Sequence, residues 1–197
     1  MRRGVYPGSF DPPTTAHLAV AEAALSQRRL QRLDLVVSRR PLGKSAPVHP
    51  SLDDRLAVLR ESVSHLESVR VLSVESRLLV DIAAGYDVVV MGADKWHQIH
   101  QVEFYDGSAR RRDEAIASLP DVAVAPRPPF PLPPRLALDL DPEHHATSST
   151  RARAGDLDLM TAAARAHAEA TGAWTAAALL RRSSRRGPGD RNTPSPG

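Results

Sequence analysis

The sequence predicts an α/β protein with a Rossmann-like, doubly wound parallel sheet and helices on both faces. Short apolar runs alternate along the chain with segments of helical periodicity, and no internal repeat interrupts this order. Polar motifs that suit phosphate follow directly after apolar runs, where parallel sheets bind their ligands. The 197 residues suffice for one domain, which we expect over residues 1–180, followed by a disordered tail over residues 181–197.

The first elements are a strand, a helix and a second strand. Gly4–Tyr6 is a short strand, and Thr14 or Thr15 begins a helix that extends to about Arg29. Leu33–Ser38 is the second strand, because valines occupy its centre.

The second helix is marked by its cap. Ser51 precedes it, and Asp54 follows three residues later, as in a capping box. One apolar face is formed by Leu52, Leu56, Leu59, Val63 and Leu66.

The later elements follow the same alternation. Further strands are predicted at Val69–Val74, Asp87–Met91, Val122–Ala125 and Leu136–Leu140, the second of these in the centre of the sheet because it is the most apolar. Further helices are predicted over residues 78–84, before Gly85, and over Leu159–Arg181.

Composition excludes several classes of protein. The absence of cysteine excludes disulfides, thiolate metal sites and cysteine nucleophiles. No run of 18 apolar residues is present, and the first ten residues lack the apolar stretch of a secretory signal. We therefore expect a cytoplasmic protein without a membrane partner.

The basic charge belongs to the tail. The net charge is +3. Residues 181–197 contain five arginines and one aspartate, which gives +4 and leaves −1 for residues 1–180. The domain therefore offers no argument for a nucleic-acid partner.

The first motif, GSFDPPTTAHL, follows the first strand. Gly8 permits a tight turn and a close approach of backbone to a phosphate. Thr14 and His17 lie three residues apart in a first helical turn, so they share a face near a positive helix end. A histidine there can donate a hydrogen bond to a phosphate oxygen.

The string YPGSFDPPTTAH resembles the HxGH signature of the nucleotidylyltransferase superfamily. Thr14 occupies the first histidine position, as is common in the phosphopantetheine adenylyltransferase branch, and Ala16 replaces the glycine.

The second motif is SSTRAR, late in the chain. Ser148, Ser149 and Thr150 supply hydroxyls at a predicted helix start, and Arg153 follows one turn later. Hydroxyls, free N–H groups and a guanidinium together suit the outer phosphates of a nucleotide. The string resembles the family's ISSTxxR motif, with Thr147 in place of Ile.

The third motif, MGADKW, follows an apolar strand. Gly92 permits close approach, and Asp94 can accept hydrogen bonds from ribose hydroxyls. The string resembles the GAD…W motif of nicotinate mononucleotide adenylyltransferases, in which a tryptophan lies near the pyridine ring. Trp96 is as consistent with a core residue as with that role, for which Phe104 or Tyr105 are alternatives.

Basic residues extend the resemblance. Lys44 lies where both branches place residues that bind phosphate, with Arg39 and Arg40 as neighbours, and Arg127-Pro128 resembles a pair in the nicotinate branch. Lys44 also belongs to a near match to a P-loop, but Ser38 replaces the first glycine of that motif and prolines follow.

The resemblance implies an adenylyltransferase that moves AMP from Mg·ATP to a small phosphorylated acceptor and releases pyrophosphate. Catalytic roles are expected for His17, Thr14 and Lys44. Nucleotide contacts are expected from Gly8, Ser9, Phe10, His17, Gly92, Asp94, Ser148, Ser149, Thr150 and Arg153. Acceptor contacts are expected from Ser9, Arg39, Lys44, Trp96 and Arg127. No protein ligand is assigned to a metal, because Mg²⁺ would be held mainly by phosphates and water.

The acceptor stays open between nicotinate or nicotinamide mononucleotide, phosphopantetheine and a third compound, and CTP stays an alternative to ATP. Departures from the family motifs, such as Ala16 in place of glycine, also leave a non-catalytic nucleotide-binding module as an alternative function. A homo-oligomer is compatible with the sequence.

Overall fold

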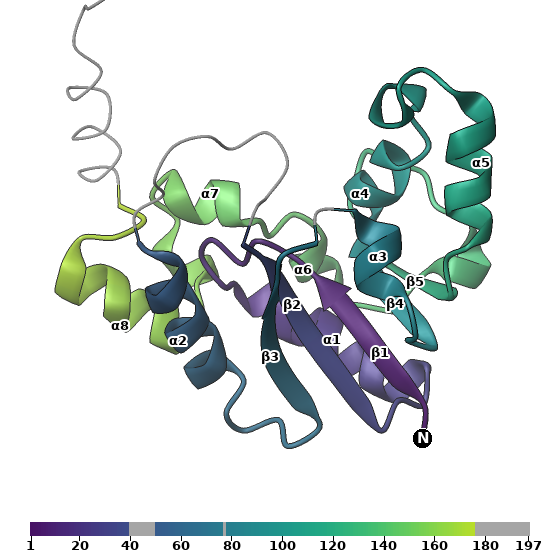
Figure 1. Cartoon of the computed structure of the whole chain (residues 1–197). Coiled ribbons are helices and arrows are strands. Elements are labelled where there is room, and N and C mark those ends of the chain that lie inside the picture. The colour runs from purple at the N-terminus through teal and green to yellow at the C-terminus, as the bar shows by residue number, and fades with distance from the viewer. Residues whose placement is uncertain (40–49, 77, 176–197) are drawn as a thin grey trace, which may run out of the picture.

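A computed structural model describes residues 1–39, 50–76 and 78–175. Lys44, Arg40 and the tail over residues 181–197 therefore lie outside the described residues. The strands are β1 (Arg3–Pro7), β2 (Arg32–Ser38), β3 (Val69–Val74), β4 (Val88–Gly92) and β5 (Asp121–Ala125). They form one parallel sheet in the order β3-β2-β1-β4-β5 (Figure 1).

The α-helices of the described part are α1 (Thr15–Gln27), α2 (Leu52–Ser62), α3 (Leu79–Ala83), α4 (Ala93–Gln98), α5 (Ala109–Ala117), α6 (Pro142–His145), α7 (Ser149–Arg153) and α8 (Ala162–Thr171). Short 3₁₀ turns lie at Val102–Tyr105, Pro134–Leu136 and Leu157–Leu159. Among the described residues, no helix is both long enough and apolar enough to cross a bilayer.

The sheet is buried on both faces. Alternate strand residues form two separate clusters, because neighbouring side chains of a strand point to opposite faces. On one face Leu33, Leu35 and Val37 of β2 pack with α1 and α2. On the other face Val5, Val36 and Val89 pack with α3 and α4. The doubly wound arrangement predicted from the sequence is confirmed.

A third cluster lies outside the sheet. It joins α2, α7 and α8 through Val58, Ala152, Ala164, Ala168 and Trp174. The small alanine side chains let α8 lie close to α2, as Figure 1 shows. This cluster attaches the last described segment to the rest of the protein.

Several boundaries agree with the sequence. Ser51 caps α2 by accepting a hydrogen bond from the backbone N–H of Asp54, and the Asp54 carboxylate accepts one from the backbone N–H of Ser51. The strand predicted at Val69–Val74 has the same bounds in the structure. α3 ends two residues before Gly85, whose φ is +78°.

Three expectations were wrong. The run Leu136–Leu140 is no strand, because it contacts β5 only through a bridge between Val124 and Ala137. The 3₁₀ turn Pro134–Leu136 occupies its start, where proline lacks the N–H that a ladder needs. β1, rather than the strand DVVVM (β4), is the middle strand.

The third error concerns the helix predicted over Leu159–Arg181. α8 begins after Thr161, whose hydroxyl accepts from Ala164 N–H, and it ends before Gly172, which has a φ of +71°. A residue with that φ cannot continue a right-handed helix. Leu159 belongs to the preceding 3₁₀ turn.

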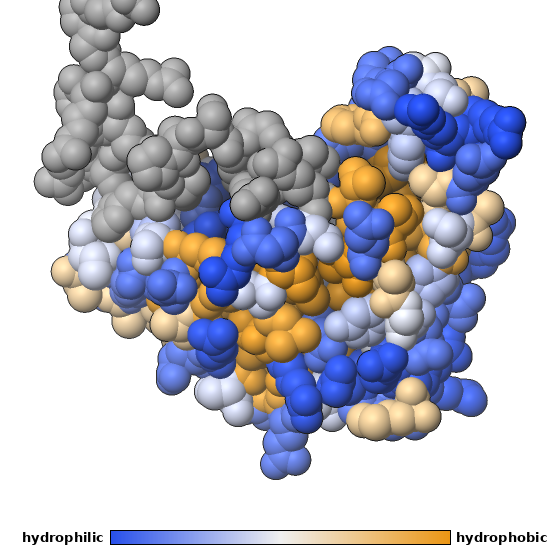
Figure 2. Space-filling view, in the orientation of Figure 1, coloured by the Kyte–Doolittle hydropathy of each residue, from blue (hydrophilic) through white to orange (hydrophobic). Residues whose placement is uncertain are grey.

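Apolar surface also gathers over β3 and α3 (Figure 2). Leu72 of β3 and Leu78, which precedes α3, are the large apolar side chains exposed there.

Candidate active site at the carboxyl ends of the strands

The direction of winding reverses between β1 and β4. Chain order runs outward from β1 to β2 and β3, and then from β4 to β5 on the other side. In such sheets the ligand crevice lies at the carboxyl ends of the strands beside this reversal. The loop after β1 and the start of α4 after β4 meet at that place.

The loop after β1 is folded around Phe10. The Phe10 ring is 1% exposed and packs edge-on against Tyr6, at 5.4 Å between ring centroids, and His17, at 5.0 Å. A Cβ at position 8 would lie 2.8 Å from this ring, so only glycine fits. The sequence predicts that Gly8 lets a phosphate approach the backbone, and the structure shows a second reason for glycine at this position, which is the contact with the Phe10 ring. Phe10 therefore offers only backbone groups to a ligand.

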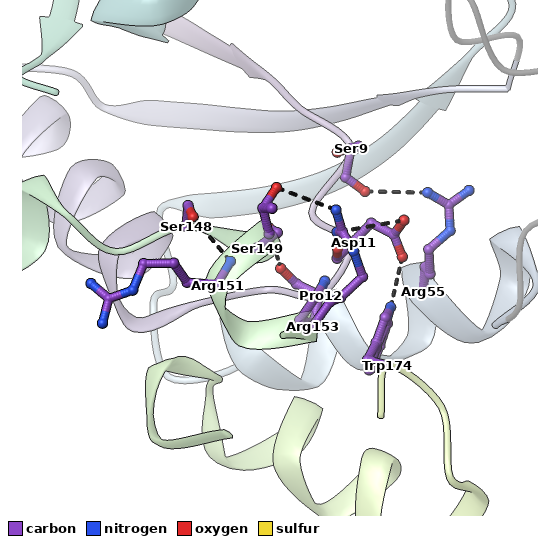
Figure 3. A network of polar contacts seen from close by, with 10 residues as sticks. Ser9, Asp11, Pro12, Arg55, Ser148, Ser149, Arg151, Arg153 and Trp174 are labelled. Atoms are coloured by element: carbon purple, nitrogen blue, oxygen red, sulfur yellow. Dashed lines mark hydrogen bonds and ion pairs between the residues drawn. The ribbon is translucent and has the colours of Figure 1, made fainter. Parts of the chain in front are cut away.

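The carbonyls of this loop accept hydrogen bonds from donors outside it. Arg55 of α2 donates from Nη1 to the Ser9 carbonyl at 3.3 Å. Arg153 of α7 donates from Nη1 to the Asp11 carbonyl. Figure 3 shows both guanidinium groups turned toward the loop.

Two further donors continue the series. Ser149 donates from Oγ to the Pro12 carbonyl at 2.8 Å, and the backbone N–H of Thr161 donates to the Pro13 carbonyl at 3.2 Å. Prolines supply no N–H, so this loop cannot form its own ladder. Its conformation is therefore set by α2, α7 and the start of α8.

His17 is held by its own helix cap. Its Nδ1 accepts from the backbone N–H of Thr14 at 3.0 Å and contacts Thr14 Oγ1 at 2.9 Å. A ring whose Nδ1 accepts a hydrogen bond has its proton on Nε2 when neutral. The shared face predicted for these two residues is confirmed, and Nε2 is left as the donor.

The charge state of His17 follows from its surroundings. Burial, together with a smaller effect from the positive charge of Arg127, lowers the pKa of His17 from 6.5 to about 4. The ring is therefore neutral at physiological pH. A neutral Nε2–H group can donate a hydrogen bond to an anionic oxygen without transferring its proton to that oxygen.

The SSTRAR segment is a short helix start, as predicted. Ser148 caps α7 by accepting from the backbone N–H of Arg151 at 3.2 Å. Thr150 Oγ1 accepts from Arg153 Nη2 at 3.4 Å. The contacts of Ser149 with the Pro12 carbonyl and of Arg153 with the Asp11 carbonyl bring the second motif against the first, although the two lie far apart in the chain (Figure 3).

The third motif lies on the other side of β1. Gly92 caps α4, and a Cβ at that position would lie 2.5 Å from Asp94 Oδ1. That oxygen lies 3.5 Å from Nε of Arg127, which follows β5. The charges of Arg127 and Asp94 both act on Tyr6, whose pKa is raised above its ordinary range mainly by burial. Asp94 and Arg127 thus form one charged pair near His17.

The remaining residues predicted to bind the acceptor are Ser9, Arg39, Lys44 and Trp96. Arg39, after β2, donates to Ser73 Oγ at 3.1 Å and lies 3.8 Å from Glu75. Trp96 packs partly buried in the cluster beneath α4, with its ring centroid 4.4 Å from that of His100. Ser9 is exposed at the loop, and Lys44 lies outside the described residues.

The alternatives to Trp96 lie farther along the chain. Phe104 is 46% exposed, and Tyr105 donates from its hydroxyl to the Ile99 carbonyl at 3.0 Å. In the described part, no three His, Asp or Glu side chains are grouped so as to hold a metal ion.

Sequence reasoning missed Arg55 and Trp174. Arg55 is 8% exposed and lies next to Leu56 on the buried side of α2. An arginine beside the apolar face of the predicted helix could have indicated a buried cation. Trp174 donates from Nε1 to Asp11 Oδ1 at 2.6 Å, and both residues are buried. A role for Trp174 could not be recognised from the sequence, because the residue falls within the helix predicted over Leu159–Arg181.

Comparison with known proteins gives a family and several relatives. A family model described as cytidylyltransferase-like matches residues 5–155. The phosphopantetheine adenylyltransferase of Herpetosiphon aurantiacus is 43% identical over 94 residues, which cover 47% of this chain and 53% of that protein. The corresponding protein of Roseiflexus castenholzii is 40% identical over 94 residues, again 47% of this chain and 55% of that protein. The chain thus spans about half the length of these two curated relatives.

A longer match is found with a differently named protein. The probable nicotinate-nucleotide adenylyltransferase of Chlorobaculum tepidum is 30% identical over 169 residues, which cover 77% of this chain and 86% of that protein. The family model spans the loop after β1, the start of α4 and α7, which are the three segments that form the site. The chain therefore belongs to the cytidylyltransferase-like family.

Proposed function

We propose that the protein is an adenylyltransferase, which transfers AMP from ATP to the phosphate of a small acceptor and releases pyrophosphate. The observation that carries this proposal is the contact between the loop after β1, which leads into the first turn of α1 with His17, and the SSTRAR segment, through Ser149 and Arg153. This contact places a neutral histidine donor and a guanidinium near one loop. The names of the relatives support the same activity.

The chemistry is a single in-line displacement. An oxygen of the acceptor phosphate attacks the α-phosphorus of ATP, and the bond from that phosphorus to the pyrophosphate oxygen breaks. No covalent enzyme intermediate is required, so catalysis consists of positioning and of stabilising the developing charge. Mg²⁺ enters bound to ATP and neutralises phosphate charge.

His17 would act on the α-phosphoryl group. Its Nε2–H donates to a non-bridging oxygen, where charge develops in the transition state. Thr14 fixes this tautomer through Nδ1. The backbone of Gly8, Ser9 and Phe10 borders the same space.

Arg153 and Thr150 would bind the outer phosphates through their side chains, and Ser149, whose hydroxyl proton is donated to the Pro12 carbonyl, through its backbone N–H. A guanidinium binds phosphate oxygens with two donors at once. Arg153 uses one donor for the Asp11 carbonyl and one for Thr150 Oγ1, so further N–H groups remain for a ligand. Ser148 serves mainly as the helix cap.

For the acceptor, we favour nicotinate or nicotinamide mononucleotide. The Asp94–Arg127 pair supports this choice. The Asp94 carboxylate can accept hydrogen bonds from the ribose hydroxyls of a mononucleotide, and the Arg127 guanidinium can bind its phosphate or carboxylate. The longer relative also carries the nicotinate name. We assign Lys44 and Arg39 to acceptor phosphate, and Trp96 to its ring.

Phosphopantetheine is the second candidate. The observation that favours it is the higher identity of the shorter matches, which reaches 43% over 94 residues.

The test is pyrophosphate release from Mg·ATP and Mg·CTP. Each nucleotide is combined with nicotinate mononucleotide, nicotinamide mononucleotide, phosphopantetheine, flavin mononucleotide or a sugar phosphate. We expect release with ATP and one acceptor, and nicotinate mononucleotide is our choice. Release with CTP alone would contradict the choice of nucleotide. Nucleotide binding without release for any acceptor would instead favour a non-catalytic module.

A further inference from the structure

The strongest unexplained feature of the site is the buried carboxylate of Asp11. Its side chain is part of the loop after β1 and is 8% exposed. Oδ1 accepts from the indole N–H of Trp174 at 2.6 Å, while Oδ2 lies 4.0 Å from Nη1 of Arg153 (Figure 3). A buried carboxylate requires hydrogen-bond donors, and here Trp174 supplies one to Oδ1 while Arg153 lies at the ion-pair limit from Oδ2.

Trp174 reaches this loop from the last described segment. It is 2% exposed and packs in the cluster of Val58, Ala152 and Ala168. It also lies beyond residues 5–155, the part that the family model matches. Its indole offers only one polar group, the N–H, and that group is directed to Asp11.

The distances show which partner Asp11 has. At 2.6 Å the contact with Trp174 is a full hydrogen bond, whereas 4.0 Å to Arg153 is the limit of an ion pair. The Arg153 side chain is 27% exposed, so part of its guanidinium faces solvent. If the indole N–H were lost, the carboxylate would turn toward the nearest cation, which is Arg153.

We propose that Trp174 is a positioning residue for ATP: its indole N–H holds the Asp11 carboxylate through Oδ1, which keeps Oδ2 at the 4.0 Å limit of an ion pair with Arg153 and leaves the remaining N–H groups of that guanidinium to bind phosphate. The inference rests on the proposed function, because it assigns Arg153 to the outer phosphates. It adds a residue that acts on ATP binding without touching ATP.

The first test is Trp174→Phe in the full chain, with the dissociation constant of Mg·ATP measured by calorimetry. Phenylalanine keeps most of the ring packing and removes the donor. We expect ATP to bind about tenfold more weakly, because Arg153 is then paired with Asp11. The matched control is Thr175→Val, which removes the hydrogen bond from Thr175 to the Gly172 carbonyl in the same segment, and it should leave the constant within twofold of wild type.

The second test separates this role from simple support of the core. Adding Asp11→Asn to Trp174→Phe removes the charge that would capture Arg153. We expect the double variant to regain most of the ATP affinity. A purely structural role predicts the opposite, a further loss, and that result would overturn the inference.

A third measurement needs no variant at position 174. The indole N–H of Trp174 should exchange slowly with solvent in the wild-type protein, and Asp11→Ala, which removes the acceptor oxygen, should accelerate its exchange. Unchanged exchange would overturn the hydrogen bond itself.

The outcomes also separate the inference from the proposed function. A wild-type protein that binds no ATP would overturn both. Wild-type binding with an unchanged constant in Trp174→Phe would overturn only the role of Trp174.

Discussion

His17 shows how one hydrogen bond fixes the chemical state of a side chain. The backbone N–H of Thr14 occupies Nδ1, so a neutral ring has its proton on Nε2. Burial and the charge of Arg127 keep the ring neutral by lowering its pKa to about 4. The residue types and their spacing could be read from the sequence, but the tautomer and the pKa shift could not, because Arg127 comes from a distant strand.

This pKa shift predicts an effect on stability. Between pH 6.5 and about 4, the unfolded chain binds a proton at His17 that the folded chain does not bind. The free energy of unfolding should therefore decrease as the pH falls through this range, and it should show no contribution from His17 above it. His17→Gln should reduce this decrease in urea unfolding at pH 7 and pH 4.5. An identical pH dependence in the variant would contradict the shift.

Arg153 provides a second prediction for a single residue. Arg153→Ala should raise KM for ATP by about tenfold and raise the acceptor KM less, because the guanidinium is assigned to the outer phosphates. Arg151→Ala is the matched control on the same helix, since Arg151 pairs with Asp156 at 2.9 Å. A raised acceptor KM with an unchanged ATP KM would reverse the assignment.

Among the elements, α8 illustrates why small residues matter. Ala164 and Ala168 are 0% and 1% exposed, and they form one stripe against the cluster of α2 and α7. The backbone N–H of Thr161, which caps α8, donates to the Pro13 carbonyl in the loop of the site, so the position of α8 affects that loop.

Ala164→Leu should therefore destabilise the protein by about 1–3 kcal/mol, because the larger side chain cannot fit between α8 and α2. Ala166→Leu on the exposed face of the same helix should change stability by less than about 0.5 kcal/mol. Urea unfolding measures both. Equal effects of the two substitutions would show that α8 is not tightly packed.

Prediction of elements succeeded where local signals were strong. The capping box before α2 and the valine-rich strands are such signals, and they were confirmed. It failed at Leu136–Leu140 because an apolar alternation does not show whether a strand partner is available. It failed for α8 because an alanine-rich stretch carries helix propensity on both sides of Gly172, and only the backbone angle of that glycine marks the end.

At the scale of the whole molecule, the fold explains why distant motifs meet. The order β3-β2-β1-β4-β5 puts the loop after β1 beside the start of α4, and α7 then packs against the same loop. The fold class and the three motifs could be predicted from the sequence, because parallel strands end on one edge of their sheet. The hydrogen bond of Trp174 to Asp11 could not, because it depends on the tertiary path of the last segment.

The position of the site predicts the effect of a truncation. The three motifs that form the site all lie before residue 155, and residues 181–197 are rich in Arg, Pro, Gly and Ser and contain none of them. Removal of residues 181–197 should therefore leave kcat and both KM values within about twofold of the full chain, as steady-state kinetics would show. A large loss would make the tail part of the site.

The central claim is that His17 stabilises charge on the α-phosphoryl group, and His17→Ala tests it most directly. Pyrophosphate release from Mg·ATP and the active acceptor should fall in kcat by about 10²–10³-fold, the usual effect of removing one such donor. Circular dichroism at pH 7 should show the same secondary structure in the variant and the wild type. A folded variant whose kcat lies within twofold of wild type would contradict the account.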